Sequence, residues 1–500
     1  MKMNNENTAQ STFPYPISKS YLKEVFHDCS DFMIRQINIG ENADFPIYFC
    51  WFDGLTSGTD IADNVLHPLT SPLRFDHCST YQDVYDEIIQ GAVYSVSVKD
   101  RDATDDLVAD LLSGSCALLF DELHRAITYE TRSTFMRSVD QSTLEKSVKG
   151  PKEAFIENIR VNTCLVRRKL RTPKLKNVPV KVGEKSDTAV SLLYIEGVAK
   201  DSTVQQVDEQ VKQLDIDGLL TPGYLEQYIV GSPRSPFPQL LHTEKPDTFA
   251  SMLLNGRVGI LIDGIPVGYL LPAQLNRFMQ VSEDTARHFV VSSMLILLRY
   301  VALLIGLLLP GLYVAIAMYH QEMIPTELLT SVIEAKQDVP FSTALEVLGM
   351  LIAFELLQEA GLRLPNPVGD TVSIIGALIV GQAAVDAKIV SPIAVIIVAF
   401  SGISSYTLPS QDLASAVRVL RLGFVLISMV AGIFGIVCGF ALLIWHLCTI
   451  ESYGVSYLAP FVDDNWHGWV RSLLRRPLWK DVFRNQKVVG IDMRKQKNKG

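Results

Sequence analysis

Apolar residues are unevenly distributed along this chain of 500 residues. Before about residue 287, no apolar run reaches the length of about 20 residues that a helix needs to cross a bilayer. The short apolar runs in this first half end in an acidic residue and glycine, a pattern that predicts buried strands ending in turns. Beyond that point, long apolar runs follow one another. The pattern predicts a duplicated α/β soluble domain followed by an all-α polytopic membrane domain.

The duplication is visible in two pairs of matching segments. Residues 47–54 (IYFCWFDG) match 190–197 (VSLLYIEG), and 106–121 match 248–263. Both copies keep nearly the same separation between their matched glycines, which chance similarity would rarely preserve. Each copy is expected to contain a helix that ends at glycine and a strand that ends at an acidic residue.

The repeat, the apolar runs and the charged end of the chain together define an expected domain organisation. It consists of a disordered N-terminal tail, the first α/β subdomain, a basic helical connector, the second subdomain, a multi-pass transmembrane domain and a basic tail: 1–29, 30–135, 136–185, 186–285, 286–450 and 451–500. The first 20 residues lack the apolar segment of a signal peptide, so the first half is expected to be cytoplasmic.

Composition and motifs argue against several function classes. The net charge of −9 does not suit a nucleic-acid binder, which should be basic. The seven cysteines are scattered without a Cys-x-x-Cys pair, which favours reduced thiols over a zinc or redox site. The acidic residues that end the strands, such as Asp53 and Asp263, lack a partner histidine, lysine or metal-ligand cluster and are read as turn residues. No catalytic or cofactor-binding motif is recognised, so neither an enzyme nor a cofactor is expected.

The connector contains a basic run after Pro151, which fits the first turn of a helix. The run, Arg167 to Arg171, is too short for a nucleic-acid footprint. A solvated helix face is one interpretation, and a helix that contacts another subunit is the other.

In the second half, the clearest membrane helix is Tyr300–Tyr319. Arginines precede it and an acidic loop follows it, so the positive-inside rule places its beginning on the cytoplasmic side. The basic segment 465–500 is cytoplasmic by the same rule. Both ends inside require an even number of crossings, whereas five apolar segments can be recognised. One of them is therefore re-entrant or interfacial, or the last one splits.

Polar residues in these apolar segments are the candidate functional residues. Three lie on one helical face of 341–361, and two more form the polar end of 368–387. Ionisable groups at membrane depth usually face a bundle interior or an aqueous path, although an interfacial amphipathic helix is the alternative, and Glu359 can also pair with Arg363. They form a candidate cation pathway: Glu355, Gln358, Glu359, Gln382 and Asp386.

Small residues form two seams that would let membrane helices pack closely. The seams consist of Gly369, Ser373, Ala377 and Gly381, and of Gly432, Gly435 and Gly439. The second seam lies in the apolar stretch 422–447, which Arg418 and Arg421 precede. That stretch is long for one span and short for two.

Six segments carry a resemblance to a known family: 235–238 (SPFP), 255–264 (NGRVGILIDG), 323–329 (MIPTELL), 354–365 (FELLQEAGLRLP), 376–385 (GALIVGQAAV) and 454–461 (GVSYLAPF). In their order and density, they resemble the GerA family of spore germination proteins, A-subunit type, over residues 25–462. Gln358 and Lys152 stand where the family usually shows arginine. The family's charge pattern therefore does not carry over at position 358.

The resemblance implies a nutrient germinant receptor in the inner membrane of dormant spores. Such A subunits are expected to assemble with a transporter-like B subunit and a lipoprotein C subunit. They are also expected to form homo-oligomeric rings in the membrane lipid, whose helices make a ligand-gated cation channel. A related stage V accessory protein, which amplifies ion release without its own nutrient sensor, is the alternative within the family. A secondary transporter would need a repeat in the membrane half, where none is recognised.

Overall fold

The computed structural model describes residues 13–39, 45–69, 75, 78–93, 97–133, 145, 149–363, 379–462, 469, 472–485 and 487–496. These residues divide into two units. The first contains residues 1–230, 240–272 and 481–500, and the second contains residues 231–239 and 273–480.

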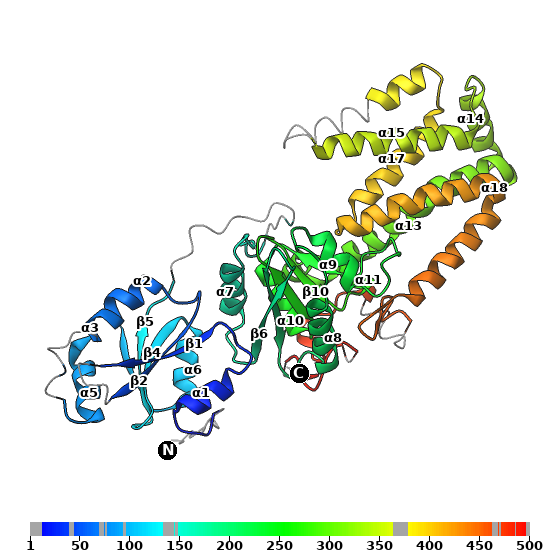
Figure 1. Ribbon diagram of the computed structural model, residues 1–500. Helices are drawn as coiled ribbons and strands as arrows, with labels where there is room; N and C mark the ends of the chain where they lie inside the picture. Colours follow the sequence, from blue (N-terminus) through cyan, green and yellow to red (C-terminus); the bar gives the residue numbers. More distant parts are fainter. Residues whose placement is uncertain are drawn as a thin grey trace. The chain divides into compact units, whose positions relative to one another are not determined.

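The first unit begins with an antiparallel sheet in the order β1-β2-β4-β5-β3 (Figure 1). Its strands are β1 (Phe32–Asn38), β2 (Pro46–Phe52), β3 (Val98–Arg101), β4 (Ser115–Phe120) and β5 (Arg125–Glu130). Every residue of β4 is buried, and successive side chains enter two different apolar clusters. Leu118 packs in one cluster and Leu119 in the other, as the alternation of side chains along a strand requires.

Helices accompany this sheet on both of its faces. They are α1 (Lys19–Val25), α2 (Gly58–Asp60), the π-helical η1 (Ile61–Leu66), α3 (His67–Leu69), α5 (Tyr81–Glu87), the π-helical η2 (Ile88–Ala92) and α6 (Thr104–Leu112). Leu107 and Leu111 of α6 pack in one cluster, whereas Val84 and Tyr85 of α5 pack in the other. Helix α1 lies within the segment 1–29 that was expected to be a tail, and its Leu22 is fully buried.

The second sheet repeats the topology of the first, in the order β6-β7-β9-β10-β8. Its strands are β6 (Leu175–Val182), β7 (Thr188–Ile195), β8 (Leu241–Thr243), β9 (Val258–Ile262) and β10 (Gly268–Leu271), and its helices are α7 (Ile159–Lys169), α8 (Asp201–Lys212), α9 (Pro222–Ile229) and α10 (Pro246–Leu254). The identical strand order confirms the duplication predicted from the sequence. β6 begins before residue 186, where the matching segments had placed the start of the second subdomain.

The matched glycines occupy equivalent turns in the two subdomains. Gly54 and Gly197 have φ angles of 86° and 77°, and Gly114 and Gly256 have φ angles of 92° and 88°. Residues other than glycine rarely adopt such φ angles. The repeat was therefore visible in the sequence because both copies need glycine at the same two turns.

Helix α7 ties the two subdomains together through a buried ion pair. The Arg167 side chain is 1% exposed, and its guanidinium binds both carboxylate oxygens of Asp31 at the start of the first sheet. Arg167 Nη2 also donates to the Leu175 carbonyl at the start of the second sheet. The expectation of a solvated basic face is therefore wrong at this residue.

The segment near the C-terminus packs on the second subdomain. Val489 is 2% exposed and forms an antiparallel bridge with Ala199, directly after the β7 turn. The Gly490 amide donates to the Val198 carbonyl at 2.8 Å. A Cβ atom placed at Gly256 would lie 2.9 Å from a methyl carbon of Val489.

The first subdomain fills the equivalent position with residues that directly follow β5. Arg132 forms an antiparallel bridge with Thr56 after the β2 turn. A Cβ atom placed at Gly114 would lie 3.2 Å from the Arg132 side chain and 3.0 Å from the Leu55 carbonyl oxygen. The C-terminal segment thus occupies, on the second subdomain, the position that the residues directly after β5 occupy on the first.

The second unit is mostly helical. Its elements are α11 (Leu275–Phe278), α12 (Glu283–Ala286), α13 (Phe289–Tyr319), the 3₁₀ helix η4 (Gln321–Met323), α14 (Thr326–Lys336), α15 (Thr343–Arg363), α17 (Pro392–Tyr406), α18 (Gln411–Thr449), the short strands β11 (Glu451–Ser452) and β12 (Val455–Ser456), and the 3₁₀ helix η5 (Leu478–Lys480). Residues 379–386 are also helical. Within the described chain, α13 and α18 are long and apolar enough to cross a membrane. The predicted succession of two sheet-containing subdomains and an apolar helical region is confirmed.

Candidate functional site in the apolar helices

Glu355 of α15 is held by two arginines of α18. The Arg421 Nη2 atom donates to Glu355 Oε1 at 2.6 Å, and Arg418 Nη1 lies 3.4 Å from Glu355 Oε2. The Arg421 side chain is only 1% exposed, whereas that of Glu355 is 26% exposed. Both arginines precede the apolar stretch 422–447 in the sequence, and both lie inside α18, which begins at Gln411.

Arg421 extends this network to two more helices. Its Nη1 atom donates to the Ser401 hydroxyl of α17 at 3.1 Å. That hydroxyl donates in turn to the Gly306 carbonyl of α13 at 3.0 Å. One buried guanidinium therefore links α15, α17 and α18 directly and reaches α13 through Ser401.

The other candidate cation-pathway residues lie on more open surfaces. Gln358 is half-buried, whereas Glu359 is exposed on α15. Gln382 and Asp386 are exposed on the helix formed by residues 379–386. Within this single chain, Glu355 is thus drawn into the helix bundle while both other acidic candidates remain at its surface.

The first small-residue seam is described only at Gly381. This glycine is buried, and a Cβ atom there would lie 3.3 Å from a methyl carbon of Val395 on α17. That short distance is consistent with a tight hairpin between the helix of residues 379–386 and α17. The other three members, Gly369, Ser373 and Ala377, lie outside the described residues.

The second seam contains a sharp break in α18. Gly432 has φ 59° and ψ −142°, which is not a helical conformation. An unbroken helix of 39 residues would be about 58 Å long, well beyond the hydrocarbon thickness of about 30 Å. The stretch that looked long for one span therefore consists of two legs, which meet at Gly432.

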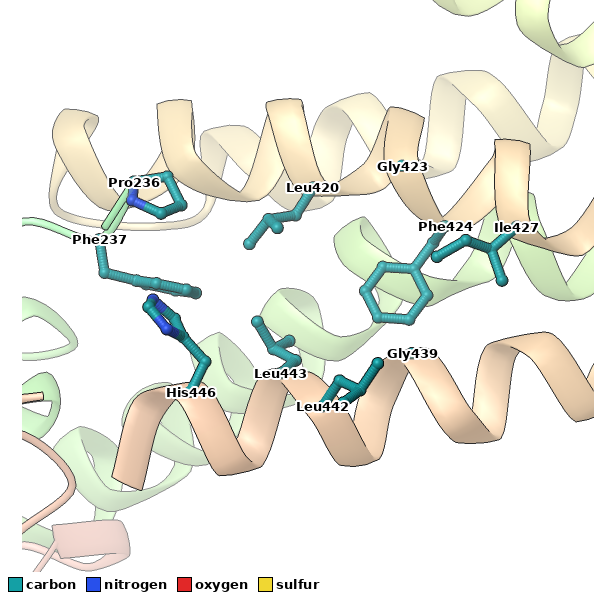
Figure 2. A pocket seen from close by; sticks show the side chains of 10 residues that line it. All are labelled: Pro236, Phe237, Leu420, Gly423, Phe424, Ile427, Gly439, Leu442, Leu443 and His446. Atoms are coloured by element: carbon teal, nitrogen blue, oxygen red, sulfur yellow. The ribbon is translucent and has the colours of Figure 1, made fainter. Parts of the chain in front are cut away.

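The two legs face each other across an apolar cavity of about 280 Å³ (Figure 2). Gly439 allows the approach, since a Cβ atom there would lie 3.2 Å from the Phe424 ring. His446 donates to or accepts from the Ser235 hydroxyl at 2.9 Å, which fixes one end of the cavity. The lining residues are Pro236, Phe237, Leu420, Gly423, Phe424, Ile427, Gly439, Leu442, Leu443 and His446.

Gly435 also lies next to the break. A Cβ atom there would lie 2.7 Å from a methyl carbon of Ile427 and 2.8 Å from the Ala431 Cβ. Both neighbours belong to the first leg, so the chain just after the bend passes very close to the chain before it. The predicted seam thus serves contacts within α18 at Gly435 and Gly439.

Glu346 is a buried carboxylate that the candidate pathway did not include. Its side chain is 0% exposed, and its Oε2 atom accepts from the Ser391 amide at 2.9 Å, at the start of α17. The Lys336 Nζ atom of α14 lies 3.4 Å from Glu346 Oε1. The sequence signal was a glutamate in the first turn of a largely apolar helix, which is indistinguishable from a favourable helix-end charge.

Comparison with known proteins identifies the family. A family model described as "Bacillus/Clostridium GerA spore germination protein" matches residues 20–487. This chain belongs to the GerA family. The match includes both α/β subdomains and the apolar helices, and it ends at residue 487, just before Val489.

Relatives of this GerA-family chain align over most of their length. Spore germination protein KA of Bacillus subtilis is 35% identical over 93% of this chain and 85% of its own. Spore germination protein B1 of the same organism is 34% identical over 91% and 93%, respectively. The uncharacterized membrane protein YfkQ of B. subtilis is 37% identical over 91% of this chain and 87% of its own.

A solved structure also resembles part of this GerA-family chain. It is the N-terminal domain of the A subunit of the Bacillus megaterium spore germinant receptor GerK3. The two are 30% identical with a TM-score of 0.41, over 52% of this chain and 98% of the other.

Proposed function

We propose that this GerA-family protein is the A subunit of a nutrient germinant receptor and that copies of it form a ligand-gated cation channel. The family match and the germination proteins aligned along nearly the whole chain support the receptor role. Two helices apolar enough to span a membrane, and a relative named as a membrane protein, support a membrane location. The membrane we assign is the inner membrane of the dormant spore.

The channel role rests on one observation, the exposure of acidic side chains on apolar helices. Glu359 on α15 and Asp386 on the helix of residues 379–386 are both exposed in the single chain. Ionisable groups in membrane helices rarely face lipid and usually face protein or water. We therefore place them along an aqueous path between copies, together with Gln358 and Gln382. Acidic side chains at such a path attract cations.

Glu355 has a different part in this proposal. Its pairing with Arg421 and Arg418 reduces the negative charge that it can offer to a passing ion. It holds α15, the helix on which Glu359 lies, against α18. It belongs to the pathway as a residue that positions the helices, and the exposed acids make the direct contact with the ion.

The receptor assembly is part of the same proposal. A transporter-like B subunit and a lipoprotein C subunit are its partners, and the surrounding membrane lipid contacts the exposed apolar residues of α13 and α18, such as Met294 and Phe434. The α/β subdomains and the C-terminal segment lie on the spore-core side. The C-terminal segment supports this placement, because it follows the second unit in the chain and packs on the second subdomain. The ends of the second unit then lie on one side, so its helices cross an even number of times.

Two other functions remain as alternatives. The accessory A-like protein of the same family would share the fold and lack a dedicated nutrient partner. B-type and C-type genes next to this one would favour the receptor. A secondary transporter is less well supported, because the duplicated strand order lies in the first unit. We propose no enzymatic activity.

Potassium release from spores tests the channel role. Spores carrying Glu359→Gln or Asp386→Asn should release potassium several-fold more slowly after nutrient addition, with unchanged amounts of the protein by immunoblot. Glu322→Gln is the matched control, because Glu322 is an exposed acid in η4, outside the apolar helices. Release at the wild-type rate in both variants would refute the direct role of these acids.

A further inference from the structure

The strongest unassigned site in the second unit surrounds the buried carboxylate of Glu346. Lys336 of α14 and the Ser391 amide at the start of α17 contact this carboxylate, and Lys336 also contacts Thr343 of α15. Thr343 and Ser391 are 2% and 0% exposed. An ionised carboxylate so far from water requires a positive charge nearby.

The Lys336 ammonium supplies that charge from outside the bundle. Its Nζ atom donates to the Thr343 hydroxyl and lies 3.4 Å from Glu346 Oε1. Glu346 Oε1 itself accepts no hydrogen bond among the described residues. The ammonium therefore contacts two oxygen atoms. Its contact with the Thr343 hydroxyl is a hydrogen bond, and its contact with Glu346 Oε1 is an ion pair without a hydrogen bond.

Helix α14, which carries this ammonium, is weakly attached to the bundle. All of its residues are described, and none is buried. Leu328 and Ile333 are 59% and 56% exposed. A second contact at this end, between Lys388 and Asp338, joins two exposed side chains and therefore contributes little. Displacement of α14 would remove the ammonium and leave the carboxylate buried without a counter-charge.

We propose that Glu346 lies at a monovalent-cation site, which the tethered ammonium of Lys336 occupies in this structure. An alkylammonium head and a potassium ion are both compact single charges that accept oxygen neighbours. The Glu346 carboxylate and the Thr343 hydroxyl, which both contact Lys336 Nζ, supply oxygens of the kind that hard cations prefer. When α14 moves away, a free monovalent cation takes the place of Lys336. The site deepens the proposed cation channel, but its ability to bind an ion can be measured without any ion flow.

The test compares unfolding temperatures of the purified full-length chain in detergent. Potassium chloride is exchanged for N-methyl-D-glucamine chloride, whose cation is too large for the site, at the same ionic strength. Wild type should unfold at the same temperature in both salts. Lys336→Met should unfold at a lower temperature in N-methyl-D-glucamine chloride and regain about 3–5 °C in potassium chloride.

Three further variants make the result specific. Lys336→Ala, which leaves more room, should respond to potassium at least as strongly as Lys336→Met. Adding Glu346→Gln to Lys336→Met should abolish the response. Lys388→Met is the matched control, because it removes an exposed lysine at the same end of the unit and should give no response.

The proposal is overturned by any of three outcomes. In the first, Lys336→Met and Lys336→Ala unfold identically in the two salts. In the second, they regain stability only on acidification, which would show that a proton replaces the lysine. Failure of both variants to fold in potassium chloride would show that no free cation fits. These readouts need no nutrient and no membrane potential. A potassium response, combined with normal ion release in the Glu359 and Asp386 variants, would refute the role of those two acids in ion flow. It would still support the cation site at Glu346.

Discussion

Arg421 of α18 and Glu355 of α15 form an ion pair whose arginine is almost entirely enclosed, with 2.6 Å between Nη2 and Oε1. Removing Glu355 leaves the buried charge of Arg421 without its carboxylate partner, at a cost of about 3–5 kcal/mol. Glu355→Gln and Arg421→Gln should therefore both lower the unfolding temperature of the purified chain and its amount in spores. A thermal unfolding curve and an immunoblot measure the two effects.

Arg418→Gln is the control for this pair, since its side chain is 21% exposed and lies 3.4 Å from Glu355. It should cost about 1 kcal/mol or less, as partly exposed pairs do. Replacing both members, in Glu355→Leu with Arg421→Leu, should recover part of the stability lost in either single variant. Wild-type stability of Arg421→Gln would contradict the structural role of the pair.

Gly432 is the residue on which the bend of α18 depends. Its φ of 59° costs other residues about 1–2 kcal/mol, and a Cβ atom there would lie 3.3 Å from the Tyr319 ring. Gly432→Ala should lower the unfolding temperature in detergent. Gly423→Ala in the first leg is the control, because no heavy atom of the described neighbours lies within 4 Å of its Cβ position and alanine favours helix. Equal stability of the two variants would argue that the bend does not need glycine.

The C-terminal segment should be required for the order of the second subdomain. Val489→Asp places a charge where the side chain is 2% exposed, so it should release the segment from the β7 turn. Hydrogen exchange at residues 195–200 should then become faster by at least about tenfold, which corresponds to about 1.4 kcal/mol of lost protection. Ile491→Asp is the control, since Ile491 is 86% exposed and should change nothing. Unchanged exchange in Val489→Asp would show that the segment is dispensable.

Burial raises the pKa of the Cys164 thiol on α7 to about 11, because the desolvated thiolate is disfavoured. At pH 8, Cys164 in the folded chain should react with iodoacetamide about 100-fold more slowly than a thiol of ordinary pKa. Mass spectrometry of the labelled protein measures this ratio. In urea the difference should disappear, and comparable rates before unfolding would contradict the buried setting.

The same raised pKa gives a pH dependence of stability. Between the ordinary thiol pKa near 9 and about 11, the unfolded chain has lost a proton that the folded chain still holds. Stability should therefore be fully present below about pH 9 and fall as the pH rises towards 11. Cys164→Ala should flatten part of this decline in an alkaline unfolding series, and an unchanged slope would argue against the assignment.

The duplicated fold could be predicted because its signals are local. The turn glycines at positions 54 and 197 follow apolar runs of the same length, and each needs a positive φ angle. The apolar helices were visible for a similar reason, since length and composition suffice to recognise them. The start of β6 at Leu175 was missed because this strand lies outside the matching segments.

The candidate site was only partly predictable, because its contacts join distant parts of the chain. Glu355 and Arg421 are 66 residues apart, and helical periodicity places each on a face without identifying its partner. In the sequence, Arg421 stands out only as a charge that precedes the apolar stretch 422–447. The basic composition of the C-terminal segment likewise favoured a tail and concealed the buried Val489.

Potassium release from dormant spores tests the central proposal most directly. Wild-type spores, spores without this gene and spores with the gene restored are compared after addition of candidate nutrients. The receptor role predicts that deletion abolishes release for one nutrient class and that the restored gene recovers it. Uniformly slower release for every nutrient would favour the accessory protein instead, and release at the wild-type rate for every nutrient would contradict the account.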